Sequence, residues 1–167
     1  DVFGFGSSKK KVIPEASLAV DQQQMQLGEI LVHSKIITKA QLDEALREQA
    51  ADSRRKLGAI LIAKGHVSEH GIAEVLAKQL GLPFEHLSGN IIDAEAIAAL
   101  PARLARLHKC VPLRVNNDEL CIAMSNPLDI IAIDEVEWTT KHRVSVVVAT
   151  NSDVERAIDY CYNNHRF

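Results

Sequence analysis

The chain has 167 residues, of which 47% are hydrophobic and 25% are charged, a composition typical of globular proteins. Its formal net charge of −3 gives no general basis for binding nucleic acid, because proteins that bind the phosphate backbone usually carry a basic balance or a basic face. No apolar run approaches the roughly 20 residues of a membrane span and no signal-peptide pattern is present, so we expect a cytoplasmic protein with no transmembrane segment.

The first 25 residues lack a sustained apolar period. They contain two glycines, a run of three lysines, a proline and a run of three glutamines. Such a composition is typical of segments that bury little apolar surface. We therefore predict that residues 1–25 form a flexible tail or linker.

An internal repeat follows this segment. Residues 26–49 align without gaps on residues 56–79, at an offset of 30 residues, and seven aligned positions are identical. A repeat of this length, with one break in the middle of each copy, is typical of a helix-turn-helix unit. We therefore predict a small helical bundle of two such units over residues 26–80.

The spacing within each copy supports this prediction. Leu27, Ile30 and Leu31 lie at i, i+3 and i+4, which predicts one apolar stripe on a short first helix, and the second copy repeats the pattern. Thr38 and Ser68 stand at equivalent positions before a second apolar stripe. Because serine and threonine favour helix starts, we interpret both residues as N-caps of the second helices.

The pattern changes after Gly81 and Pro83. The predicted elements are, in chain order, short helices on either side of Pro101, a hairpin of strands over residues 110–115 and 120–124, a helix over 129–140, a strand over 144–148 and a last helix capped by Ser152. This mixture predicts a small α/β domain with a mixed sheet over residues 84–165. The whole chain is thus predicted to be α+β, with a helical bundle first.

No motif indicates catalysis. A phosphate-binding loop requires GxxxxGK[ST], and the sequence contains no such run, so we expect no ATPase activity. Residues 66–70 match the HxxEH pattern of inverted zincins, but Ser68 as an N-cap would leave His66 outside the helix. The three cysteines are widely spaced without a CxxC pair, and we interpret them as buried reduced thiols. We therefore expect a protein that is not an enzyme and requires no cofactor or metal.

Several short motifs follow the repeat in a characteristic order, and they are Leu100-Pro101-Ala102, Val111-Pro112-Leu113, Ala123-Met124-Ser125-Asn126-Pro127 and Val146-Val147-Val148-Ala149. Behind paired Leu-Gly repeats, this order resembles the N-terminal domain of the ATPases that drive bacterial type II secretion and type IV pilus assembly. The resemblance covers residues 26–163. It implies a module that works with an ATPase motor in cis or in trans. It also implies docking on the cytoplasmic domain of an inner-membrane platform protein, and so a peripheral location at that membrane.

Some members of this family bind cyclic di-GMP across the two repeats. That ligand has two phosphates and two guanines, so its receptor needs cations, free backbone N–H groups and apolar surfaces in duplicate. Gly28 and Gly58 are predicted to lie near helix starts, where a phosphate or base can approach the backbone. The candidate ligand residues are Gln26, Leu27, Gly28, Leu42, Leu46, Gln49, Arg55, Lys56, Leu57, Gly58, Ile72, Leu76 and Gln79.

The sequence departs from the family pattern at a few positions. The family usually has arginine before each Leu-Gly pair, whereas this chain has Gln26 and Lys56, so one copy lacks the positive charge. Asn126 also stands where aspartate commonly precedes the proline. The alternative interpretation is a pure protein-docking module with no nucleotide binding. Trp138 and the cluster of Ile130, Ile131 and Ile133 are then the candidate docking patch, unless that helix packs them against the sheet.

Overall fold

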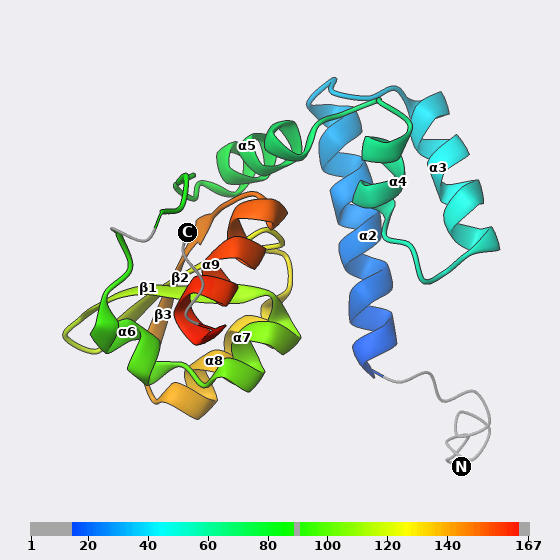
Figure 1. Ribbon diagram of the computed structural model, residues 1–167. Helices are drawn as coiled ribbons and strands as arrows, with labels where there is room; N and C mark the ends of the chain where they lie inside the picture. The colour runs from blue at the N-terminus through cyan, green and yellow to red at the C-terminus, as the bar shows by residue number, and fades with distance from the viewer. Residues whose placement is uncertain (1–14, 89–90, 164–167) are drawn as a thin grey trace, which may run out of the picture.

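The structure is a computed structural model that describes residues 15–88 and 91–163 (Figure 1). The described elements are, in chain order, α2 (Glu15–His33), α3 (Lys39–Ala51), α4 (Leu57–Ala63), α5 (Glu69–Leu80), α6 (Ala94–Ala99), α7 (Ala102–His108), β1 (Cys110–Asn116), β2 (Glu119–Met124), α8 (Ile130–Thr140), β3 (Arg143–Val148) and α9 (Asn151–Asn163). Four helices precede a second part that contains the sheet. The predicted α+β class and the order of its two parts are confirmed.

The first helix extends well into the predicted tail. Because α2 begins at Glu15, residues 15–25 are helical rather than a linker, and residues 1–14 lie outside the described part of the chain. Gln23 is buried, with 8% of its surface exposed, and its Oε1 accepts a hydrogen bond from Asn126 Nδ2 at 2.8 Å. Polar contacts with distant residues hold this part of α2 in place. Because these contacts need no apolar stripe, the sequence pattern did not indicate a helix here.

The turn between the two helices of each copy has the same geometry in both. Lys35 and Gly65 occupy equivalent positions and both have left-handed backbones, with φ of 63° and 79°. Their N–H groups donate to Val32 O and Ile62 O respectively, at 2.9 Å in each case. Glycine adopts this backbone without strain, whereas lysine in the first copy pays a modest steric cost.

Both predicted N-caps are confirmed. Thr38 Oγ1 accepts from Gln41 N at 3.1 Å, and Gln41 Oε1 accepts in return from Thr38 N at 2.9 Å, which completes a capping box. Ser68 Oγ accepts from Gly71 N at 2.9 Å at the start of α5. Because Ser68 is the cap, His66 precedes the helix and cannot share a helical face with a second metal ligand.

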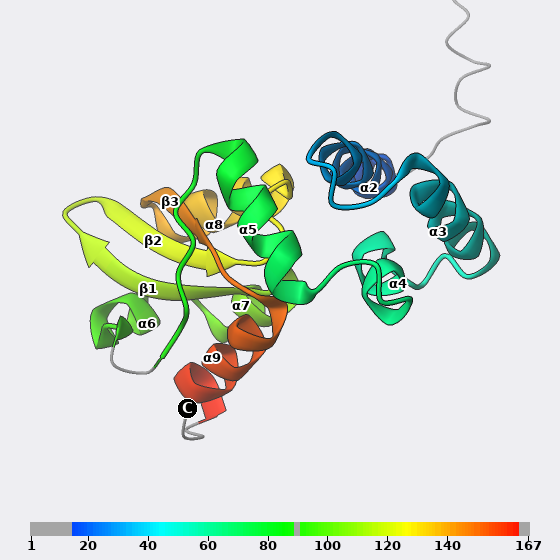
Figure 2. The ribbon, with the colours of Figure 1, turned by 90° about the horizontal axis from the view of Figure 1, so that it is seen from above.

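In the helical part, the helices of one copy pack against the helices of the other. Helix α3 lies against α4, and α5 lies against α2, so the second helix of each copy contacts the first helix of the other (Figure 2). The buried core of this part consists of Leu31, Ile37, Leu42, Ala45, Leu57, Ile60 and Leu61. The predicted two-unit architecture thus has a defined pairing of its helices.

Helix α5 differs from its counterpart α3 by having a second apolar face. Ala73 and Ala77 are buried against Val148 of β3, whereas the aligned residues of the first copy are Asp43 and Arg47. Small apolar residues at i and i+4 allow α5 to pack closely on the sheet, and charged residues at the same positions keep α3 in solvent. Although the predicted boundary lies at the end of α5, this helix belongs to the cores of both parts.

The sheet is mixed, as predicted. Its strand order is β1-β2-β3, with β1 and β2 antiparallel and β2 and β3 parallel. The turn of the β1–β2 hairpin contains Asn117, whose φ of 55° is left-handed. Helices α6, α7 and α9 contact β1, whereas α8 and α5 contact β3 (Figure 2).

Helix α8 buries only part of its apolar surface. Asp129 caps it by accepting from Ala132 N at 3.1 Å, and Ala132 and Val136 are its buried residues. Trp138 is 75% exposed and Ile130 is 58% exposed. Packing against the sheet therefore accounts for one side of the helix and leaves apolar residues in solvent on another.

The remaining features that bear on function are simple. Cys110 and Cys121 are buried, Cys161 is half-buried, and none of the three forms a disulfide. Burial raises the pKa of the Cys110 thiol to about 12. Within residues 15–88 and 91–163, no group of His, Cys, Asp and Glu side chains is arranged to hold a metal ion. No helix in the same described part has both the length and the apolar character to cross a membrane.

Candidate ligand site

The glycine of the first copy lies where three helices meet. A methyl group placed on Gly28 would lie 2.8 Å from Leu42 Cδ1 and 3.4 Å from Leu57 Cδ2. Leu42 belongs to the second helix of the same copy, whereas Leu57 belongs to the other copy. The missing side chain of Gly28 therefore allows α3 and α4 to approach α2 closely.

Gly58 occupies the equivalent position in the second copy. A methyl group there would lie 3.5 Å from Ile72 Cδ1 and 3.6 Å from Leu27 Cδ2. Ile72 is the counterpart of Leu42, and Leu27 is the counterpart of Leu57, so the contacts are the same with the copies exchanged. The two glycines thus have matched surroundings, and those of Gly58 are the looser.

A cavity of about 420 Å³ lies beside Gly58, between the helical repeats and the sheet-containing part. Its volume falls within the roughly 300–1,000 Å³ of typical small-molecule sites. The predicted ligand residues that line it are Leu27, Lys56, Gly58, Ile72 and Leu76. It is also lined by residues that the sequence analysis did not assign to the site, and these include Gln23, Gln24, Glu69, His108, Lys109, Asn126 and Asp129.

The equivalent residues around Gly28 are packed into the core instead. Gly28, Leu42 and Leu57 are buried, and Leu46 is half-buried against the same cluster. Leu42 lies closer to Gly28 than Ile72 does to Gly58, and of the two glycines only Gly58 lines the cavity. The structure therefore brings the predicted residues together as one open half-site and one closed half-site.

The side chain of Gln24 forms hydrogen bonds with polar groups of the closed half-site. Its Oε1 accepts from Leu57 N, at the start of α4, at 2.7 Å and from Gln49 Nε2 at 3.2 Å. Gln49 Nε2 also donates to Arg55 O at 3.2 Å. The side chain of Gln49, a predicted partner for a base edge, is thus engaged within the protein.

Three predicted ligand residues lie away from the cavity. Gln26 is exposed on α2 and lines a second hollow beside β3. Arg55 is exposed, with Nη1 at 3.7 Å from Glu48 Oε1. Gln79 is exposed near the end of α5. Their positions give no support for direct contact with a ligand bound next to Gly58.

The prediction that both glycines lie near helix starts is correct for one of them. Helix α4 begins at Leu57, so Gly58 is in its first turn, whereas Gly28 lies well inside α2. Only the first four N–H groups of a helix lack partners in the helix itself. Of the two glycines, only Gly58 therefore lies at a helix start that faces the cavity.

The cavity contains one cation that no carboxylate neutralises. In the described part of the chain, Lys56 has no ion-pair partner. Lys109 Nζ lies 3.7 Å from Glu155 Oε2, and His108 Nε2 lies 2.7 Å from Glu135 Oε1. The unneutralised charge of Lys56 is therefore available to an anionic ligand.

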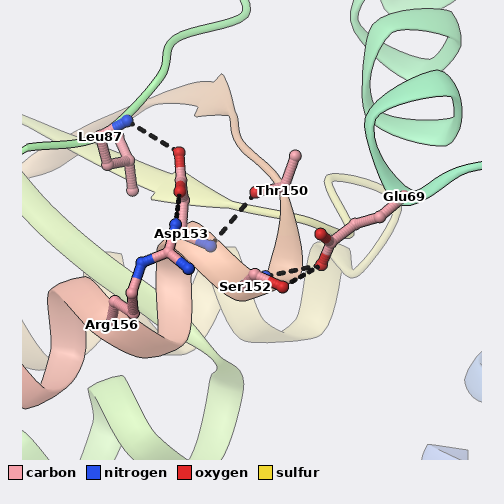
Figure 3. Close-up of polar contacts among 6 residues, drawn as sticks. All are labelled: Glu69, Leu87, Thr150, Ser152, Asp153 and Arg156. Atoms are coloured by element: carbon pink, nitrogen blue, oxygen red, sulfur yellow. Dashed lines mark hydrogen bonds and ion pairs between the residues drawn. The ribbon is translucent and has the colours of Figure 1, made fainter.

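Polar contacts tie the α5 side of the cavity to α9. Glu69 Oε1 accepts from Ser152 N at 2.7 Å and from Ser152 Oγ at 2.9 Å (Figure 3). Thr150 Oγ1 accepts from Asp153 N at 3.2 Å, so Thr150 caps α9 and the prediction that Ser152 does so is wrong. Asp153 Oδ2 accepts in turn from Leu87 N at 3.0 Å. The Glu69 carboxylate thereby occupies the positive end of α9.

Gln23 and Gln24 were not predicted as site residues, because they lie in the segment that was predicted to be a tail. Gln23 and Gln24 precede Leu27 by four and three residues, which places all three on one side of α2. Extending the helical period of the repeat backwards by one turn would have found them. Lys109 and Asn126 carry no comparable signal, because only the fold brings them to the cavity.

Solved structures share this architecture. The structure of MshE with cdg is 34% identical to this chain with a TM-score of 0.72, over 81% of this chain and 98% of that one. The structure of the N-terminal domain of XpsE has the same fold, with 24% identity, a TM-score of 0.64 and coverage of 82% and 94%. The class defined by the fold and its repeats is thus the N-terminal domain of secretion and pilus assembly ATPases, which confirms the resemblance seen in the sequence.

The chain belongs to the MshEN domain family, whose sequence profile matches residues 80–166. Its curated relatives include the type IV pilus assembly ATPase PilB of Myxococcus xanthus, 31% identical over 81% of this chain and 24% of the relative. Bacteriophage adsorption protein B of Escherichia coli K12 is 29% identical over 84% of this chain and 18% of that protein. The chain therefore spans about a quarter or less of the length of these relatives.

Proposed function

We propose that this chain is a non-catalytic regulatory module that binds cyclic di-GMP in the cavity beside Gly58. It acts on an ATPase motor in the same polypeptide or in a partner, at the cytoplasmic face of the inner membrane. The observation that carries the proposal is the matched pair of glycines, one of which opens onto a cavity with an unneutralised lysine. The similarity to the structure of MshE with cdg supports the choice of ligand.

The open half-site supplies the groups that half of a cyclic dinucleotide requires. Lys56 and the first turn of α4 suit a phosphate, because they combine a positive side chain with backbone N–H groups at a helix start. Leu27, Ile72 and Leu76 offer an apolar surface on which a guanine ring packs. Asn126 also lines the cavity. Its Nδ2 donates to Gln23 Oε1 and its Oδ1 accepts from Leu128 N, so it offers a base edge the second N–H and the second lone pair of its amide.

The closed half-site has to rearrange before it takes the second half of the ligand. Gln24 releases Leu57 N and Gln49 Nε2, and the Leu42 side chain moves away from Gly28. These are movements of side chains. The backbones of the two halves differ, because Gly58 is in the first turn of α4 and Gly28 lies inside α2. The absence of a cation at Gln26 makes the first half the weaker one.

Calorimetry with cyclic di-GMP tests this proposal. Lys56→Ala removes the unneutralised charge and is expected to weaken binding at least tenfold, since a charge-assisted contact contributes about 1.5–3 kcal/mol. Lys78→Ala is the matched control, because Lys78 is an exposed lysine of α5 that does not line the cavity. Absence of binding by the folded chain, or equal affinity of both variants, would contradict the proposal.

A second candidate function is docking on the cytoplasmic domain of a platform protein, without nucleotide binding. It is favoured by the exposed apolar side chains of α8, where Ile130, Ile131 and Trp138 are 58%, 44% and 75% exposed. Exposed apolar clusters of this kind are typical of protein contacts. A chain that gives no heat with cyclic di-GMP and binds a purified platform domain through α8 would favour this second function.

A further inference from the structure

Strand β3 is an edge strand, and the backbone groups on its inner side are hydrogen-bonded to β2. Arg143 N donates to Asp118 O at 2.9 Å, and Ala149 N donates to Met124 O at 3.1 Å, both on the side of β2. Because the N–H groups of a strand point alternately to its two sides, odd-numbered residues face β2 and even-numbered residues face outward. The outward side of β3 therefore carries the backbone groups of residues 144, 146 and 148.

Two of these three positions already have partners. Val144 N donates to Glu137 Oε2 at 3.0 Å, and Val148 N donates to Pro83 O at 2.8 Å. Among the described residues, the N–H and C=O of Val146 have no partner on that side. Val146 is thus left open between Val144, whose N–H is taken, and Val148, whose N–H and C=O are both paired.

A hollow of about 730 Å³ lies along this open edge. It is lined by four consecutive residues of β3, positions 144–147. Since consecutive side chains of a strand point to opposite faces, a hollow that touches all four reaches the edge of the strand. It also extends over one face of the sheet, where Arg114, Glu119 and Cys121 line it. Apolar side chains line the part next to the edge, and these include Leu80, Leu82, Ile130 and Ile133, whereas Glu85, Arg114, Asn116 and Glu119 line the rest.

The chain itself already adds an extended segment to the same edge. Phe84 forms a parallel bridge with Val148, and Glu85 N donates to Val148 O at 3.0 Å. This segment comes directly from the end of α5 and pairs with Val148 without forming a backbone bond to Val146. The hollow continues an edge contact that is in use a few residues away.

We propose that an extended segment of a partner polypeptide adds to β3 at Val146. One residue of the segment pairs with the N–H and C=O of Val146, and its neighbours place apolar side chains in the hollow. The backbone bonds fix the extended conformation, and the apolar lining selects for alternate apolar residues. This site is separate from the cavity beside Gly58 and does not depend on a bound nucleotide.

The shape of the edge argues against a second copy of this chain as the occupant. The open position is recessed between α8 and the end of α5, which line the hollow on either side. In a symmetric pair, the same two elements of each copy would have to enter the hollow of the other. A single extended peptide carries no flanking helices, so it can enter the hollow.

The test uses a phage-displayed library of linear peptides selected on the immobilised chain. Enriched peptides are expected to share alternating apolar residues, and their affinity is then measured by fluorescence anisotropy. Val146→Pro removes the outward N–H at a position where an edge strand tolerates proline, and is expected to weaken binding about tenfold. Val146→Ile keeps the N–H and is expected to bind like the unaltered chain.

A second measurement guards against misfolding of the proline variant. In the unaltered chain, the enriched peptide is expected to slow amide hydrogen exchange at Val146. The proposal is overturned if no peptide is enriched, if the proline variant binds equally well, or if exchange at Val146 is unchanged. It is also overturned if the chain sediments as a dimer that Val146→Pro dissociates, because the edge is then occupied by a second copy.

Discussion

Alanine at the two equivalent glycines is expected to change stability in opposite directions. Within a helix, alanine is favoured over glycine by up to about 1 kcal/mol, because it loses less backbone entropy on folding. At Gly58 the added methyl group would lie 3.5 Å from Ile72 and 3.6 Å from Leu27, which are ordinary contact distances. We expect Gly58→Ala to raise the free energy of unfolding by about 0.5–1 kcal/mol.

The same change at Gly28 meets a packed core. The methyl group would lie 2.8 Å from Leu42 Cδ1, and Leu42 is only 6% exposed, so it has little room to move. Overpacking of a core costs about 1–3 kcal/mol, which exceeds the gain in helix propensity. We expect Gly28→Ala to lower the free energy of unfolding by about 1 kcal/mol.

Urea unfolding followed by far-UV circular dichroism measures both variants against the unaltered chain. The comparison is valid when the denaturant slope is the same in all three proteins. Gly58→Ala should also weaken binding of cyclic di-GMP, because its methyl group narrows the open half-site. If the two substitutions shift stability in the same direction by the same amount, the distinction between an open and a closed half-site is wrong.

Three further predictions follow from the contacts around the cavity and from the buried thiol. Gln24→Ala should lower the free energy of unfolding by about 1–2 kcal/mol, because it leaves Leu57 N without its partner, and an unchanged urea midpoint would contradict this. Glu69→Ala should cost about 1–2 kcal/mol in the same assay through loss of both hydrogen bonds from Ser152, and an effect near zero would show that this contact is not formed in solution. The Cys110 thiol has its pKa raised by burial from 9.0 to about 12, so iodoacetamide at pH 9 should label it in urea but not in the folded chain, where rapid labelling would refute its burial. A raised pKa means that the folded state holds this proton more tightly, so the thiol's contribution to stability is complete below pH 9 and is lost as the pH rises towards 12.

The parts of the fold that could be predicted from the sequence are those fixed by local chemistry. Thr38 and Gln41 form a capping box within four residues, and the aligned Ser68 caps α5 by accepting from Gly71 N. The hairpin turn at Asn117 is likewise set by residues that tolerate a left-handed backbone. The offset of 30 residues then places Gly28 and Gly58 against equivalent residues, Gly28 beside Leu42 and Leu57 and Gly58 beside Ile72 and Leu27, because the aligned apolar stripes pack alike.

The parts that could not be predicted depend on contacts between distant residues. The first turns of α2 carry polar residues, and Gln23 finds its partner in Asn126, 103 positions away. The alignment of the two copies shows that Ala73 stands where the first copy has Asp43, but it does not show what Ala73 contacts. In the structure, this apolar residue packs α5 on the sheet. As a result, one wall of the cavity comes from residues outside the repeat. The packing that closes the half-site around Gly28 is likewise not predicted by the similarity of the two copies.

The most direct test of the account is a nuclear magnetic resonance titration of the isotope-labelled chain with cyclic di-GMP. We predict saturable shifts of the backbone amides of Lys56, Gly58 and Asn126, which belong to both walls of the cavity, and a shift of Leu57 as Gln24 releases its N–H group. Amide signals that stay unchanged at saturating ligand, or that shift only on α8, would contradict it.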